Sequence, residues 1–85
     1  MSSFEKLVER FLGNPKDFTY DELRRLLTKL GYTETTKGKT SGSRVAFIDR
    51  KSKHMIRVHK PHPGNTVKEY VIKMVKTELQ EQGKL

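Results

Sequence analysis

Two short segments with alternating apolar side chains constrain the fold of this chain most strongly. They are RVAFID at residues 44–49 and HMIRVH at residues 54–59, and a polar turn of four residues separates them. A period of two is typical of β-strands with one buried face, and the short turn predicts an antiparallel hairpin. The matched apolar side chains that should face the core are Val45, Phe47, Ile56 and Val58.

This register also predicts what the hairpin shows to solvent. With a four-residue turn, Arg44 lies opposite His59 and Ala46 lies opposite Arg57. The face away from the core should therefore carry two arginines and a histidine close together.

Helix signals lie on both sides of the hairpin. Apolar residues at positions 4, 7, 8, 11 and 12 predict a short helix that ends at Gly13. Thr19 and Glu22 have capping-box spacing and predict the start of a second helix, which Gly31 should end. Thr66 and Glu69 have the same spacing and predict the start of a third.

The expected order of elements is α, α, β, β, β, α, with the first strand beginning near Tyr32. A three-stranded antiparallel sheet with both long helices on one face is the simplest two-layer packing of these elements. We therefore expect one α+β domain over residues 1–85. Residues 1–14 would form an extra N-terminal helix, which either packs on the domain or associates with another molecule, and residues 19–85 would form the core.

The net charge of +8 is large for 85 residues and is unevenly distributed. Residues 33–63 hold eight basic and two acidic side chains, a net charge of +6. A local basic field favours a polyanion, because each neutralised phosphate releases counterions, so RNA or DNA is the leading partner class. The plainer alternative is a solvated basic face without a ligand.

Other classes of protein fit the composition poorly. Cysteine is absent, which excludes disulfides and thiolate chemistry. No uncharged apolar run approaches the ~18 residues of a membrane span, so we expect a cytoplasmic protein with no membrane contact. The chain is too short for a deep substrate cavity.

Two histidines in the segment VHKPHPGN are the candidates for chemistry. An imidazole can accept and donate protons near neutral pH, and RNA cleavage needs a base for the 2′-OH proton and an acid for the leaving 5′ oxygen. We assign this role to His59, with His62 as a second proton-transfer group. The alternative is that both residues end the strand or bind phosphate without chemistry.

The cations around these histidines would hold RNA. Arg44 and Arg57 could bind the reacting phosphate, and Lys37, Lys39 and Lys60 could contact the sugar-phosphate backbone. Neither a metal site nor a cofactor is expected, since no acidic or cysteine ligand lies near the histidine pair.

The remaining histidine and the aromatic residues have structural interpretations. His54 lies at the hairpin turn and is expected to be a solvated surface residue. Most aromatic side chains fall at positions expected in the core, which argues against a stacking platform for single-stranded bases. The expected core set is Phe4, Phe11, Tyr32, Phe47 and Tyr70.

The succession DELRRLLTKLGY, GSRVAFID, IRVHKPHPGN and ELQEQGKL resembles the HicA family of bacterial toxins. The resemblance covers roughly residues 19–85 and leaves the first helix outside it. It implies a double-stranded-RNA-binding-domain-like fold, an mRNA endoribonuclease activity that does not require the ribosome, and neutralisation by a HicB-like antitoxin.

One position departs from the family pattern. Typical members open the second strand with Gly-Ser-His, and that histidine is needed for cleavage; here the triplet is Gly42-Ser43-Arg44. An arginine cannot act as a general base, because it stays protonated far above neutral pH. Either His59 has taken over the role, or the protein binds RNA without cutting it. A third alternative is that the basic face serves mainly to dock an acidic antitoxin.

Overall fold

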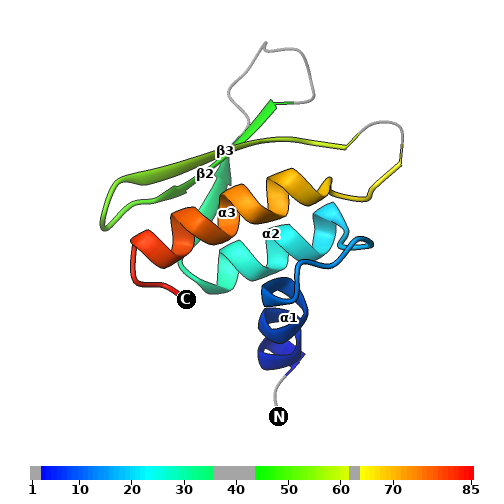
Figure 1. Ribbon diagram of the computed structural model, residues 1–85. Coiled ribbons are helices and arrows are strands. Elements are labelled where there is room, and N and C mark those ends of the chain that lie inside the picture. The colour runs from blue at the N-terminus through cyan, green and yellow to red at the C-terminus, as the bar shows by residue number, and fades with distance from the viewer. Residues whose placement is uncertain (1–2, 36–43, 62–63) are drawn as a thin grey trace.

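The computed structural model describes residues 3–35, 44–61 and 64–85 (Figure 1). Its elements follow the predicted order. They are α1 (Ser3–Leu12), α2 (Tyr20–Lys29), β1 (Tyr32–Thr35), β2 (Arg44–Asp49), β3 (His54–His59) and α3 (Glu69–Glu81).

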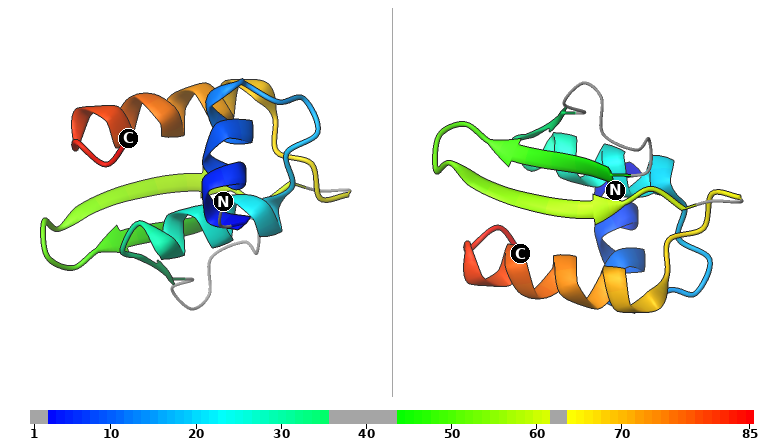
Figure 2. Two further views of the ribbon diagram at one scale, coloured as in Figure 1. Left: turned by 90° about the horizontal axis from the view of Figure 1, so that it is seen from below. Right: turned by 90° about the horizontal axis from the view of Figure 1, so that it is seen from above.

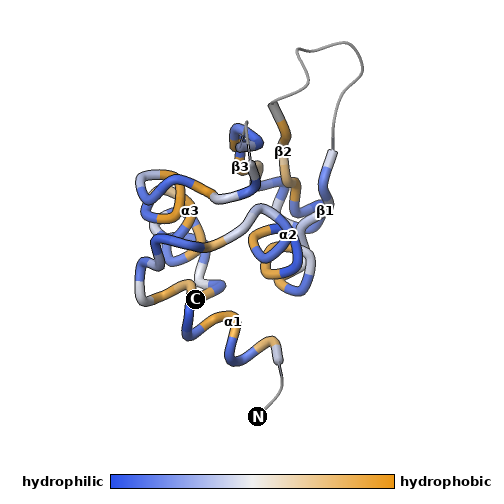
Figure 3. The backbone as a smooth tube through the Cα atoms, turned by 90° about the vertical axis from the view of Figure 1, so that its right-hand side faces the viewer, coloured by the Kyte–Doolittle hydropathy of each residue, from blue (hydrophilic) through white to orange (hydrophobic). Residues whose placement is uncertain are grey.

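The strands form one antiparallel sheet in the order β1-β2-β3. Both α2 and α3 lie on the same face of this sheet, and α1 lies beneath the two helices on the side away from the strands (Figures 1 and 3). Figure 2 shows that α1 runs across the ends of α2 and α3 rather than along them. The α+β fold predicted from the sequence is confirmed.

The register of the hairpin is the one that alternation predicts. Arg44 pairs with His59 and Ala46 pairs with Arg57, within six consecutive pairs that join β2 to β3. The four side chains expected in the core are all buried, with exposed fractions of 4% or less: Val45, Phe47, Ile56 and Val58.

The helix α2 begins and ends as its sequence predicts. The Thr19 side chain accepts a hydrogen bond from the N–H of Glu22 (3.2 Å), and Oε1 of Glu22 accepts one from the N–H of Thr19 (2.9 Å), which completes the capping box. Gly31 follows the helix with φ +102°, a left-handed conformation that glycine adopts without strain.

The start of α3 differs from the prediction. The N-cap residue is Lys68, not Thr66, and no side chain caps the helix. Thr66 instead forms a β-bridge with Thr19, in which the N–H of Val67 donates to the carbonyl of Phe18 at 2.7 Å. Backbone pairing with a distant segment therefore replaces the local capping box and delays the helix by two residues.

The helix α1 packs on the rest of the domain. Leu7 and Phe11 are buried in the common core, and the ring of Phe11 lies 5.5 Å from that of Phe18. The guanidinium of Arg10 adds a polar contact, with Nη1 at 3.0 Å from both carboxylate oxygens of Glu22. This answers the question that the sequence left open for the N-terminal helix.

One aromatic residue was wrongly placed in the core. Tyr70 is 62% exposed on α3, whereas Ile72, which the sequence pattern did not single out, is fully buried. The buried stripe of α3 is therefore centred on Ile72 and Val75, and Tyr70 lies outside it.

Candidate nucleic-acid interface

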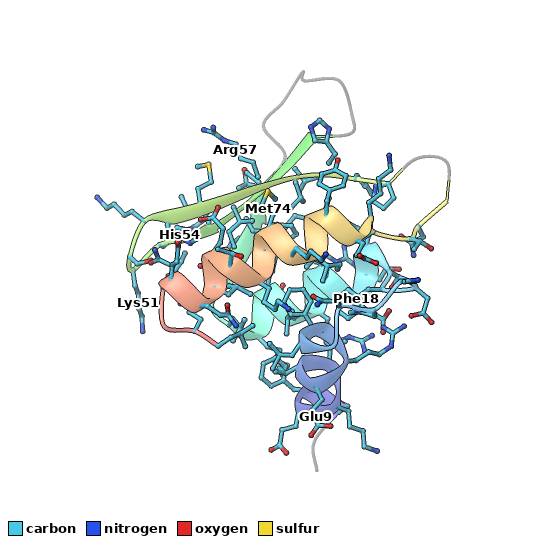
Figure 4. All side chains as sticks on the ribbon, in the orientation of Figure 1. Glu9, Phe18, Lys51, His54, Arg57 and Met74 are labelled. Carbon is cyan, nitrogen blue, oxygen red and sulfur yellow. The ribbon has the colours of Figure 1, made fainter. Side chains whose placement is uncertain are left out.

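The face of the hairpin that points away from the helices carries two of the predicted site residues. Arg57 and His59 are both exposed and lie two residues apart on β3, with Met55 before them. Figure 4 shows Arg57 projecting away from the helical layer. The neighbouring positions on β2, Ala46 and Ile48, are half-buried.

The other predicted site residues are described only in part. The backbone of Arg44 pairs with His59, which puts the two residues side by side across the ladder. The side chain of Arg44 lies outside the described part of the structure, and so do Lys37, Lys39 and His62. Within the described residues, His59 and Arg57 are therefore the members of the predicted site whose side chains share one face.

Lys60 has a different setting. It continues the alternation of Val58 and turns toward α2, where its Nζ lies 5.4 Å from the centroid of the Tyr20 ring. Lys60 is exposed, but it contacts the helical layer rather than the outer face of the sheet. The structure thus separates Lys60 from Arg57 and His59, which the sequence had grouped together.

The ring beneath Lys60 belongs to a small polar group. The hydroxyl of Tyr20 donates to Glu34 on β1, and Nη1 of Arg24 lies 3.7 Å from the same carboxylate. Burial of Tyr20, followed by its hydrogen bond to Glu34, raises the pKa of the phenol well above its usual value. Tyr20 therefore stays neutral and has a structural role.

His54 is not the solvated residue that the sequence predicted. Its side chain is only 14% exposed, Nδ1 lies 2.6 Å from the Tyr32 hydroxyl, and Nε2 lies 3.2 Å from Oε1 of Glu78. Burial, with the nearby charges of Asp49 and Glu78, raises the pKa of Tyr32. The sequence did hold a signal, because His54 has the same strand parity as the buried Ile56.

A partly buried ion pair lies next to this histidine, at Asp49, its partner across the β2–β3 ladder. Nζ of Lys84 is 2.6 Å from Oδ2 of Asp49, and Asp49 also accepts hydrogen bonds from the N–H of Lys51 and the hydroxyl of Ser52. These contacts, that of Lys84 first, lower the pKa of Asp49 to about 2. Through these contacts the Asp49 carboxylate connects the hairpin turn to the C-terminal segment.

A second basic surface lies on α2. A shallow hollow of about 380 Å³ is lined by Asp21, Arg24, Arg25, Thr28 and Lys29. Two carboxylates offset the charge of Arg24, since Asp21 lies at 3.6 Å and Glu34 at 3.7 Å. Its lining carries three cations and one carboxylate, but it lies in the helical layer and not on the outer hairpin face, so we do not assign it a role in the candidate site.

The described residues bring no metal-binding cluster together. Within residues 3–35, 44–61 and 64–85, no group of three or more His, Asp or Glu side chains has the geometry to hold a metal ion. No helix in this part of the chain is long and apolar enough to cross a membrane.

The fold and the basic hairpin face define a class: small α+β proteins with a cationic antiparallel sheet backed by helices. Within this class, the chain belongs to the HicA toxin family, because the family model described as "HicA toxin of bacterial toxin-antitoxin" matches residues 20–82. The match contains both α2 and α3 and the whole sheet, and α1 precedes it. Searches of the curated proteins and of the solved structures give no significant match.

Proposed function

We propose that this protein is the toxin of a toxin-antitoxin pair and cleaves mRNA in the cytoplasm as a metal-independent endoribonuclease. The observation that carries the proposal is the outer hairpin face of a HicA-family chain, where Arg57 and His59 are exposed together on β3. Their neighbours Val58 and Ile56 are buried, so the strand is fixed while the two polar side chains face solvent.

The chemistry assigned to this face is transesterification of the RNA backbone. The 2′ oxygen attacks the phosphorus, the 5′ oxygen leaves, and a proton must be removed from the first and given to the second. His59 supplies one of these proton transfers and His62 the other. Arg57 and Arg44 hold the phosphate and offset the charge that builds up in the transition state.

The test is incubation of the purified protein with a long unstructured RNA in EDTA, followed by a denaturing gel. We expect fragments from the wild type and none from His59→Ala, and we expect His59→Ala to bind the uncut RNA with nearly unchanged affinity. A variant that still cleaves at the wild-type rate would contradict the role of His59. Intact RNA with the wild type would contradict the enzymatic function itself.

A second candidate function is RNA binding without cleavage. The observation that favours it is the pairing of Arg44 with His59, because it puts a residue that cannot act as a base at the position beside the only exposed imidazole among the described residues. In that case the toxin would act by staying bound to its RNA and would not cut it. A gel shift that weakens steeply with salt, with no fragments after long incubation, would identify it.

We also propose that the partner in the pair is a HicB-like antitoxin. Support comes from membership in the HicA family and from the net charge of +8, which suits an acidic partner. A small acidic protein encoded by the adjacent gene, and its co-purification with this chain, would be the expected result.

A further inference from the structure

The strand β3 forms an open edge of the sheet. The strand order is β1-β2-β3, and all six residues of β3 pair with β2 on one side only. Within the described part of the chain, no backbone hydrogen bond connects the other side of β3 to another segment. Such an edge presents free N–H and C=O groups that can pair with an additional strand.

The helix α3 runs alongside this edge (Figures 1 and 2). Tyr70 and Met74 are 62% and 39% exposed, and with Glu78 they form a row at four-residue spacing on one side of the helix. The contact between Glu78 and His54 places the C-terminal end of this row beside β3. Figure 4 shows Met74 on the side of α3 next to the strand.

The spacing of this row matches that of an added strand. Four residues of α-helix rise about 6 Å, and two residues of a β-strand rise about 6.8 Å. Successive side chains on one face of an added strand would therefore lie over Met74 and Tyr70 in turn. Apolar side chains at these positions would cover surface that is now exposed to water.

Charge determines which partner fits the other face of the added strand. Residues 50–59, from the hairpin turn through β3, contain four lysines and arginines and no acidic residue. Side chains that point to the outer face would lie beside Arg57 and His59, where acidic groups are favoured. A second copy of β3 would instead bring like charges together, which is destabilising across a strand pair.

We propose that the edge of β3 and the row formed by Tyr70 and Met74 bind an extended segment of a protein partner by β-strand addition. The segment alternates apolar side chains, which cover α3, with acidic side chains, which lie next to Arg57 and His59. Such a strand would also hinder RNA from reaching the outer hairpin face. The inference goes beyond RNA cleavage and is tested without RNA chemistry.

The probe is a synthetic octapeptide of alternating glutamate and valine, added to the full-length ¹⁵N-labelled protein. We expect the largest amide shifts in β3 and at Tyr70 and Met74, with slower hydrogen exchange along β3. A peptide of the same composition with four glutamates followed by four valines should bind at least about tenfold more weakly. N-methylation of the alternate peptide nitrogens that face β3 should abolish binding, because it removes the ladder hydrogen bonds.

Two matched variants separate the apolar row from general surface effects. Met74→Glu should weaken binding of the alternating peptide about tenfold. Leu12→Glu should leave it unchanged, since Leu12 is exposed to a similar extent (41%) but lies on α1. The N-methylated peptide tests the backbone pairing with β3 in the wild-type protein and needs no variant.

Several results would overturn the proposal. These are absence of peptide binding, equal binding of the block peptide or the N-methylated peptide, and shifts centred on β1 or α2. Concentration-dependent shifts of β3 without peptide would show that a second copy occupies the edge. Shifts of Tyr70 and Met74 by a 12-nucleotide RNA but not by the peptide would assign the row to RNA. None of these outcomes bears on the cleavage test in EDTA.

Discussion

Nε2 of His54 lies 3.2 Å from Oε1 of Glu78, and this contact joins the first residue of β3 to the last turns of α3. The same imidazole meets the buried Tyr32 through its other nitrogen. His54 therefore links three elements at one end of the sheet, whereas His59 stands exposed at the other end.

The two histidines should differ in how much stability the protein loses when each is replaced by alanine. His54→Ala is expected to lower the free energy of unfolding by about 1–3 kcal/mol, because the buried Tyr32 hydroxyl loses its partner. His59→Ala should change it by less than about 0.5 kcal/mol, as is usual for an exposed side chain that has no such contact among the described residues. Urea unfolding followed by circular dichroism measures both. Equal losses in the two variants would contradict the structural role of His54.

Acid should destabilise the protein through Asp49. Its pKa is lowered to about 2 in the folded state, mainly by Lys84, so the folded protein favours the charged carboxylate. Between about pH 4 and pH 2 the unfolded chain binds more protons, and the stabilisation present above this window is lost as the pH falls through it.

The variant Lys84→Met should flatten this pH dependence. Thermal unfolding at pH values between 2 and 5 would show a smaller drop than in the wild type. The control is Lys73→Met, which removes a lysine whose Nζ pairs only at the surface, with Glu69 at 3.5 Å. If both variants kept the wild-type slope, the assignment of the acid transition to Asp49 would be wrong.

The helix α1 should contribute strongly to stability although it precedes the family match. Phe11 is fully buried, and its replacement by alanine is expected to cost about 3–5 kcal/mol in the free energy of unfolding. Leu12→Ala, at the next position but 41% exposed, is the control and should cost much less. Similar small losses in both variants would mean that α1 contributes little to the core.

RNA binding should depend on the outer hairpin face. Arg57→Ala is expected to reduce the slope of log affinity against log salt by about 1, because one phosphate contact is lost. Lys51→Ala removes another exposed cation, at the hairpin turn and away from His59, and should leave the slope unchanged. Fluorescence anisotropy with a labelled RNA at several salt concentrations compares them. If only Lys51→Ala lowered the slope of log affinity against log salt, the RNA interface would lie at the hairpin turn instead.

The hairpin could be predicted from the sequence because the alternation of side chains along a strand is a local rule. Alternation sets which side chains share a face, and once Val45 and Phe47 are assigned to the core, the positions of Arg57 and His59 follow. The same rule, continued one residue past the strand, would have turned Lys60 to the helix side. It would also have turned His54 inward, but the nearby turn suggested exposure.

The errors arise where distant segments meet. The Thr66 capping box was wrong because Thr66 pairs with Thr19, and no local pattern shows this bridge. Tyr70 was wrongly placed in the core because the edge of the buried stripe on α3 depends on where the sheet ends. The side chains of Arg44 and His62 remain predictions, and so does the chemistry assigned to them.

The bridge between Thr19 and Thr66 also determines where this protein can be shortened. A fragment that begins at Tyr20, the first position of the family match, would lose the Thr19 cap of α2 and the Phe18 carbonyl to which Val67 donates. Trimming one end of the polypeptide would thus loosen the beginning of two helices that lie far apart in the chain. The smallest fragment that folds stably should therefore begin before the first residue of the family match.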